Sequence, residues 1–233
     1  MAKKAAVYHM NYTEQLAGTI FLVVYLLVMP LLADRLFSLA ETLFGTTLDA
    51  GERNTLYYYV LSGVTLLIFH SFLADTTRRF LDGTARAGSS LFLGLLVFYG
   101  ANALTYRAAV LLSYGAADLN NTVIAAQVRA APRTTLLISI VLVPFVEETL
   151  FRGLVFGSLR DRSRAAAYLA SSLLFAFLYA WTFAVSPRDP ANFVRLVQYL
   201  VPGMVFAWSF DRSGTLWTPF LLHAAVNALA IFT

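Results

Sequence analysis

The chain of 233 residues contains no cysteine. This absence excludes disulfide frameworks, thiolate zinc sites, iron–sulfur clusters, a cysteine nucleophile and lipidation on cysteine. Charge is also scarce, because only 13% of the residues are Asp, Glu, Lys or Arg, against roughly a quarter in an ordinary soluble domain. Hydrophobic residues make up 59%, and the mean hydropathy is +0.68. A soluble domain of this size cannot bury so much apolar surface, so the composition predicts an integral membrane protein.

Basic residues outnumber acidic ones, with a net charge of +4 and a pI of about 9.4. In a soluble protein this balance would suggest nucleic acid as a partner. Here the basic residues fall mostly between apolar stretches, which is typical of membrane loops. We therefore expect the lipid bilayer, and no nucleic acid, as their partner.

Apolar stretches long enough to cross roughly 30 Å of hydrocarbon as helices recur along the chain. The first follows Lys3 and Lys4 and resembles a secretory signal peptide, but it lacks a clear cleavage site and further stretches follow, which favours a retained span. We predict an all-α polytopic protein, a single transmembrane domain over 1–233 with about seven transmembrane helices enclosing a mid-membrane polar site. The predicted spans are 17–33, 56–73, 89–106, 134–159, 165–187, 196–210 and 213–233.

The longest polar break, 113–133, separates the third and fourth spans. Val123, Ile124 and Val128 lie along one side of a helical stretch there, which predicts a loop with an interfacial helix. A boundary between two domains is the alternative, but neither half of the chain looks water-soluble.

Basic residues are distributed unequally between the two sides of the predicted bundle. The side that holds the N-terminus carries more of them, so the positive-inside rule favours a cytoplasmic N-terminus. We expect the protein in the inner membrane of a prokaryotic cell, given its brevity. The basic residues on that side are Lys3, Lys4, Arg78, Arg79, Arg86, Arg160, Arg162, Arg164 and Arg212.

Two acidic residues, Glu147 and Glu148, and the basic Arg152 lie in the middle of the fourth predicted span. An ionisable side chain at that depth costs at least a few kcal/mol, so it needs a partner or a function. Glu148 and Arg152 share a helix face and can form a salt bridge, whereas Glu147 is rotated by about 100°. A buried ion cluster that fixes helix packing is one interpretation. The other is a free carboxylate suited to general acid–base chemistry.

His223 and Asn227 also share a helix face, near the middle of the last predicted span. Each could be an interhelical hydrogen-bonding residue of the kind common in membranes. As a pair they could also donate N–H groups to a developing oxyanion, which acyl-group hydrolysis requires.

With these motifs the chain resembles the CPBP intramembrane protease family, which includes CAAX prenyl protease 2 and the bacterial Abi group. The family's first motif, Glu-Glu-x-x-x-Arg, is matched by Glu147, Glu148 and Arg152, and its third, His-x-x-x-Asn, by His223 and Asn227. The resemblance covers about 134–230. It implies an intramembrane glutamate-type endopeptidase in which the first glutamate activates a water, the second supports it with the arginine, and the histidine and asparagine stabilise the oxyanion.

The family's second motif, Phe-x-x-x-His, is altered in this chain. Phe175 matches its start, but Tyr179 stands where the family has a histidine. In the family, that histidine and the first glutamate resemble a pair that activates water. A phenol can hold a water or donate to an oxyanion, but it is a poor proton acceptor at neutral pH. Three interpretations stay open: Tyr179 positions the water, another histidine (His70 rather than His9) supplies the role, or the chain is an impaired relative that acts as a membrane binding or scaffold protein.

Metal chemistry is the less favoured alternative, because His-Glu-x-x-His is absent. A zinc site would need Glu147, His223 and a third ligand such as Glu148 or His70, so we expect no cofactor. A proton-relaying transporter would be expected to contain an inverted repeat, and the sequence shows none. The resemblance implies a membrane-associated protein or peptide as substrate, with a prenylated tail and a C-terminal sorting tail as open alternatives.

Overall fold

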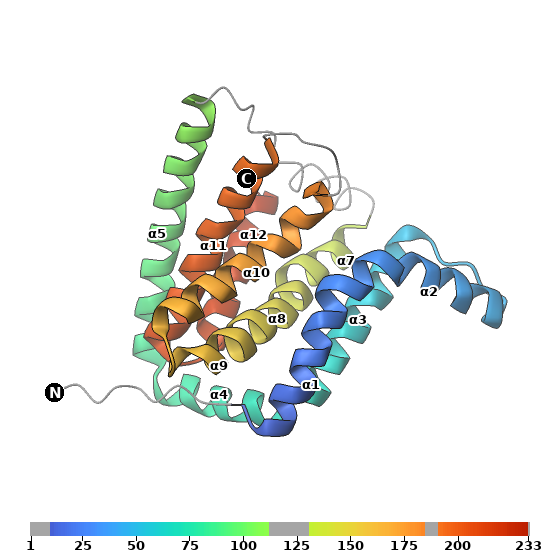
Figure 1. The fold of residues 1–233 in the computed structure, drawn as a ribbon, viewed down its shortest axis with the longest axis horizontal. Helices are drawn as coiled ribbons and strands as arrows, with labels where there is room; N and C mark the ends of the chain where they lie inside the picture. Colours follow the sequence, from blue (N-terminus) through green and yellow to red (C-terminus); the bar gives the residue numbers. More distant parts are fainter. Residues whose placement is uncertain (1–9, 112–130, 185–190, 233) are drawn as a thin grey trace.

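The computed structural model describes residues 10–111, 131–184 and 191–232, and every regular element within them is helical (Figure 1). The all-α prediction is therefore confirmed. The interfacial helix predicted within 113–133 falls almost entirely outside the described residues. The helices, with η marking π-helical turns, are α1 (Tyr12–Val23), η1 (Val24–Val28), α2 (Met29–Phe44), α3 (Ala50–Ile68), α4 (His70–Asp82), α5 (Thr84–Leu111), α7 (Pro132–Leu137), η2 (Ile138–Leu142), α8 (Val143–Glu148), η3 (Thr149–Phe156), α9 (Gly157–Arg160), α10 (Arg164–Ala184), α11 (Ala191–Ser213) and α12 (Trp217–Phe232).

Three helices in the described part of the chain are long and apolar enough to cross a membrane: Tyr12–Phe44, Thr84–Thr105 and Pro132–Arg160. A bent pair, α3 with α4, would make a fourth, and α10 and α12 hold shorter apolar stretches. Large apolar side chains such as Leu67 and Leu104 face outward, as an integral membrane protein requires in contact with lipid tails. The count of seven spans stays a prediction.

The second predicted span, 56–73, is wrong as a single helix. The chain turns by 82° between α3 and α4, at the buried Phe69. The cause is a distant carboxylate: Glu14 of α1 is buried, and its Oε1 accepts the Phe72 backbone N–H at 2.8 Å, in the first turn of α4. An acceptor at that position satisfies an N–H that a new helix start would otherwise leave unpaired. Hydropathy alone carries no signal of this contact.

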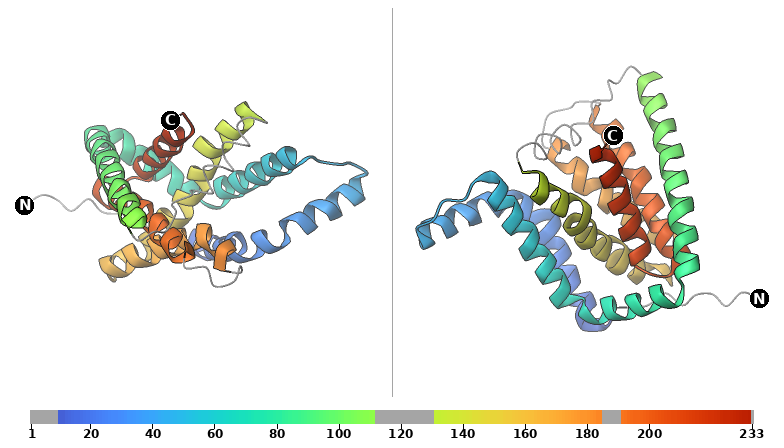
Figure 2. Two further views of the ribbon diagram at one scale, coloured as in Figure 1. Left: turned by 90° about the horizontal axis from the view of Figure 1, so that it is seen from above. Right: turned by 180° about the vertical axis from the view of Figure 1, so that it is seen from behind.

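The first predicted span, 17–33, is longer than expected, because the helix runs from Tyr12 through η1 to Phe44. Its start is set by a capping box between Asn11 and Glu14, and its end by Gly45, whose φ of 64° lies in the left-handed region. The second half, α2, buries no side chain and projects away from the rest of the molecule (Figures 1 and 2). An apolar groove of about 450 Å³ lies between α2 and α3.

The Pro132–Arg160 helix occupies the centre of the bundle and is the most buried of the three long helices. Contacts from α1 and α3 cover one side of it, and α10, α11 and α12 cover the other, with α5 outside them (Figure 1). Small residues in α10, Ser171 and Ser172, permit close packing against neighbouring helices. A Cβ at Gly203 of α11 would lie 3.0 Å from the Ser172 Cα, and the Ser171 hydroxyl donates to the Phe151 carbonyl at 2.9 Å.

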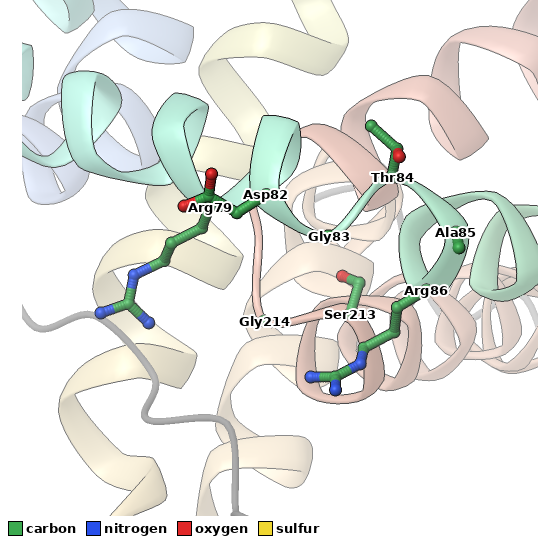
Figure 3. Close-up of a pocket in the computed structure, with 8 residues that line it drawn as sticks. All are labelled: Arg79, Asp82, Gly83, Thr84, Ala85, Arg86, Ser213 and Gly214. Atoms are coloured by element: carbon green, nitrogen blue, oxygen red, sulfur yellow. The ribbon is translucent and has the colours of Figure 1, made fainter.

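The end of α4 and the start of α5 lie at the lower end of the bundle, as do the end of α9 and the start of α10 (Figure 1). These segments carry Arg79, Arg86, Arg160 and Arg164. Arg79 and Arg86 line an open hollow of about 490 Å³ together with Ser213 and Gly214 (Figure 3). Arg160 and Arg164 both pair with Asp211, near the end of α11. Several loops predicted to share one side of the membrane therefore lie at one end, while the side that faces the cytoplasm stays a prediction.

The contact between Glu14 and α4 can be tested by replacing Glu14 with alanine. We expect Glu14→Ala to lower the free energy of unfolding by about 1–3 kcal/mol, because a buried Phe72 N–H loses its acceptor. Glu52 is the matched control, since it forms the same capping box at the exposed start of α3. Glu52→Ala should cost less than about 1 kcal/mol. Equal losses in thermal or denaturant unfolding in detergent would contradict the cap.

Candidate active site

The helix that carries Glu147 and Glu148 is irregular on both sides of them. The π-turn η2 comes before α8, and the π-turn η3 follows it. At the end of η2 the Val143 N–H bonds to the Ile138 carbonyl, five residues back. The next donor in the ladder would be the N–H of residue 144, but Pro144 has none. The Ser139 carbonyl therefore needs a donor from elsewhere.

Asn227 of α12 supplies that donor. Its Nδ2 donates to the Ser139 carbonyl at 2.8 Å, which ties α12 to the proline-interrupted helix. From the motif in the sequence, this amide is expected to be an oxyanion donor. One of its two amide hydrogens is instead committed to the backbone, so the oxyanion role stays a prediction for the other.

Glu148, Arg152 and His223 form a buried polar cluster around one carboxylate oxygen. The expected salt bridge is present, with Arg152 Nη1 3.0 Å from Glu148 Oε1, and both side chains are fully buried. The same Oε1 lies 2.8 Å from His223 Nδ1. Arg152 Nη2 also donates to the Gly203 carbonyl at 3.0 Å, and its guanidinium lies 4.6 Å from the centroid of the Phe175 ring. The cluster thus joins the central helix to α11 and α12, against a ring of α10.

Glu147, only 2% exposed, is held by two phenols. Tyr179 of α10 lies with its hydroxyl 2.9 Å from Oε1 and 3.0 Å from Oε2, and its ring stacks on Tyr199. Tyr25 of η1 donates to Oε1 at 3.3 Å. Tyr179 is predicted from the sequence as a site residue, whereas Tyr25 is not. The available signal was weak: a tyrosine in the interior of an apolar span, far from the interfaces where membrane tyrosines gather.

The structure thus brings five of the six predicted site residues, Glu147, Glu148, Arg152, Tyr179 and His223, into two linked sets on α8, η3, α10 and α12, and Asn227 lies one helical turn beyond His223. His70 does not join them. It is exposed at the start of α4, with Nδ1 3.2 Å from the Leu67 carbonyl, so its use in place of the second-motif histidine is not supported. His9 lies outside the described residues.

The zinc alternative fits the geometry poorly. A third ligand would have to come from Glu148, whose Oε1 already serves Arg152 and His223. Within residues 10–111, 131–184 and 191–232 no group of three or more His, Asp or Glu side chains could hold a metal ion. The absence of a cofactor stays a prediction.

The partnership between Asn227 and Pro144 can be tested with a double-mutant cycle. Asn227→Ala should lower the free energy of unfolding by about 1–3 kcal/mol, because the Ser139 carbonyl loses its donor. Pro144→Ala returns a backbone N–H to the ladder, so the same Asn227→Ala change should cost at least about 0.5 kcal/mol less in that background. Asn102→Ala, at an exposed position of α5, is the control for asparagine removal. Additive effects would contradict the partnership.

Comparison with known proteins covers the part of the chain that holds this cluster. The family model described as "Type II CAAX prenyl endopeptidase Rce1-like" matches residues 129–229. No solved structure matches the chain.

Among curated proteins, "Putative membrane peptidase YdiL" of Bacillus subtilis is 26% identical over 97 residues, which cover 41% of this chain and 35% of that protein. An "Uncharacterized 24.3 kDa protein" of Escherichia coli is 31% identical over 97 residues, or 42% of each chain. The "UPF0177 protein YxdF" of Lactococcus lactis is 28% identical over 90 residues, 37% of this chain and 42% of that protein.

The matched segment therefore spans less than half of each of these relatives. The segment matched by the family model contains Glu147, Glu148, Arg152, Tyr179, His223 and Asn227, and it excludes α1 to α5. The resemblance to the CPBP intramembrane proteases is confirmed, because residues 129–229 are similar to the Rce1-like family of Type II CAAX prenyl endopeptidases.

Proposed function

We propose that the protein is an intramembrane endopeptidase that hydrolyses a peptide bond of a membrane-associated protein or peptide, with Glu147 as its general base. One observation carries the proposal. Of two adjacent buried carboxylates, Glu148 is paired with Arg152, whereas Glu147 receives its hydrogen bonds from phenols. The ion pair neutralises one acid, which leaves the other available to take up and release a proton. The family description and the printed name of the Bacillus relative support a peptidase.

The reaction follows from these groups. Glu147 accepts a proton from a water molecule, and the resulting hydroxide attacks the scissile carbonyl carbon. The tetrahedral intermediate carries its negative charge on the former carbonyl oxygen. Collapse of the intermediate breaks the C–N bond, and the proton held by Glu147 passes to the leaving amine. The products are a carboxylate and an amine, and Glu147 returns to its starting form.

His223 is the donor we assign to the oxyanion, and its neighbour Glu148 decides how it can act. With Glu148 ionised by its pairing with Arg152, Nδ1 of the ring carries the proton toward Oε1. The other nitrogen, Nε2, is then an acceptor in the neutral ring and a donor in the imidazolium. The Glu148 carboxylate orients the ring, so Nε2 is the nitrogen left to donate to the oxyanion when it carries a proton.

Tyr179 supports a second candidate function. Its hydroxyl contacts both oxygens of Glu147, in the place where a water would otherwise meet the base. A chain with this contact could keep the substrate pocket while having lost hydrolysis, and would then act as a membrane binding or scaffold protein. The two functions differ in what happens to turnover when the phenol is changed.

The substrate class rests on the family description, which names prenyl endopeptidases. A prenylated tail and a C-terminal sorting tail both present a peptide bond close to the membrane. We also propose that the protein lies in the inner membrane of a prokaryotic cell. We assign its N-terminus to the cytoplasm because arginines lie at the α4–α5 and α9–α10 ends, and cytoplasmic loops are rich in basic residues.

Removal of the base tests the main proposal. We expect Glu147→Gln to lower cleavage by at least about 100-fold, because the amide cannot accept the proton from water. The purified protein in detergent is incubated with a pool of prenylated and membrane-tail peptides, and products are identified by mass spectrometry. Glu52→Gln, at the exposed start of α3, is the control and should cleave at the wild-type rate. Cleavage by Glu147→Gln at that same rate would rule out this base.

Substitution of Tyr179 separates the enzyme from the scaffold. In a working enzyme Tyr179→Phe should lower kcat by about tenfold or more, because Glu147 loses the hydroxyl that lies 2.9 Å from Oε1 and 3.0 Å from Oε2. Tyr179→His should then also lower turnover, since the shorter imidazole does not reproduce the contact. If instead the wild-type protein is inert on the pool and Tyr179→His gains cleavage, the scaffold function is the correct one.

A further inference from the structure

Tyr25 reaches Glu147 from a part of the chain that lies outside the family match at 129–229. Its side chain is 3% exposed, and its hydroxyl donates to Glu147 Oε1 across 3.3 Å. A phenol buried this deeply in an apolar bundle needs a polar partner for its hydroxyl. The partner here is the carboxylate proposed as the general base.

Side chains packed closely against two glycines fix the helix that carries Tyr25. A Cβ at Gly18 of α1 would lie 2.6 Å from Phe69 Cζ and 3.3 Å from Leu154 Cδ2. A Cβ at Gly153 of η3 would lie 2.8 Å from Met10 Cε. Because side chains are missing at both positions, α1 lies directly against η3, the turn that follows Glu148. The position of Tyr25 is thus tied to the motif helix itself.

The backbone at Tyr25 is a π-turn, η1, and it has the same construction as η2. In η1 the Met29 N–H bonds to the Val24 carbonyl, five residues back, and Pro30 follows. Single π-turns inside α-helices are frequent at functional sites, because the extra residue re-aims the side chains around them. In this protein the two proline-linked π-turns carry Tyr25 and Ser139, which contact Glu147 and Asn227.

The three phenol-to-carboxylate distances indicate a division of labour. Tyr179 lies at hydrogen-bond distance from both oxygens of Glu147, but its hydroxyl has one hydrogen to donate. Tyr25 contacts Oε1 alone. When Tyr25 donates to Oε1, the Tyr179 hydrogen can serve Oε2. Both oxygens are then held, and the carboxylate cannot rotate about its terminal bond.

We propose that Tyr25 is a positioning residue that fixes the plane of the Glu147 carboxylate, and that the N-terminal helix is therefore part of the active site. Its kinetic consequence rests on the proposed function. A base must point a lone pair at the water it deprotonates, and a small misplacement of a catalytic group lowers the rate steeply. Tyr25 acts on that orientation and touches no substrate.

The test compares two phenylalanine variants. Tyr25→Phe removes the hydroxyl that bonds to Glu147 at 3.3 Å. Tyr168→Phe removes a hydroxyl that bonds to Asp211 Oδ2 at 3.2 Å and has no contact with Glu147. Each variant loses one phenol-to-carboxylate hydrogen bond, so a purely structural effect would appear in both. The first readout, independent of catalysis, is the infrared band of the Glu147 carboxyl group, identified by its absence in Glu147→Gln.

We expect the Glu147 band to shift in Tyr25→Phe and to stay in place in Tyr168→Phe. Replacement of Tyr25 by ortho-fluorotyrosine, which keeps the hydroxyl and donates more strongly, should shift the band in the opposite direction and covers the case in which the phenylalanine variant does not fold. In cleavage assays kcat of Tyr25→Phe should fall about tenfold, with KM and the melting temperature unchanged.

An unmoved Glu147 band in both Tyr25 variants would overturn the inference, whether or not the protein cleaves peptides. A shifted band with unchanged kcat in an active enzyme would overturn the positioning role. A shifted band in a protein that cleaves nothing would support the fixed carboxylate and overturn the proposed function instead, so the two failures are distinguishable.

Discussion

The buried ion pair between Glu148 and Arg152 is the constraint on which the rest of the bundle depends. A charged pair this deep is stabilised by further hydrogen bonds to its remaining donors and acceptors. The pair draws two of them from other helices: Arg152 Nη2 donates to the Gly203 carbonyl of α11, and Glu148 Oε1 contacts the imidazole of His223 on α12. Arg152 Nε and Glu148 Oε2 are buried without a hydrogen-bond partner among the described residues. The same polar groups that are costly in lipid therefore specify which helices pack together. Glu147, the second acid, stays outside the ion pair, which leaves it available for the proposed role as general base.

Prolines give the central and N-terminal helices their local shape. Pro30 and Pro144 each follow a five-residue π-turn, and in η2 the carbonyl that the proline leaves without a donor is satisfied by Asn227. Asn227, which the proposed hydrolysis would place at the oxyanion, thus also completes the backbone hydrogen bonding of the central helix. Both uses are compatible with one amide, which has two hydrogens to give.

How much the sequence could predict depended on the range of each interaction. The Glu148–Arg152 pair follows from helical spacing alone, and the motif residues were expected to meet. The turn at Phe69 was not predictable from hydropathy, because its cause is Glu14, a residue far away along the chain. The contact between Tyr25 and Glu147 was not predicted for the same reason: nothing in the sequence around Tyr25 indicates which carboxylate it contacts. Local periodicity fixes which residues share a helix face and leaves open which helix that face will meet.

The length of the first helix has a further consequence for the membrane around the protein. Its 33 residues, Tyr12–Phe44, rise about 50 Å, whereas the hydrocarbon core of a bilayer is about 30 Å thick. The mismatch falls on α2, which buries no side chain and is tied to the start of α3 by the Glu41–Arg53 ion pair. Tilting α2 is the cheapest way to absorb it. A change in lipid acyl-chain length therefore tilts α2 first. Its effect on Tyr25 passes through η1, so this π-turn couples the thickness of the bilayer to the position of the hydroxyl that contacts Glu147.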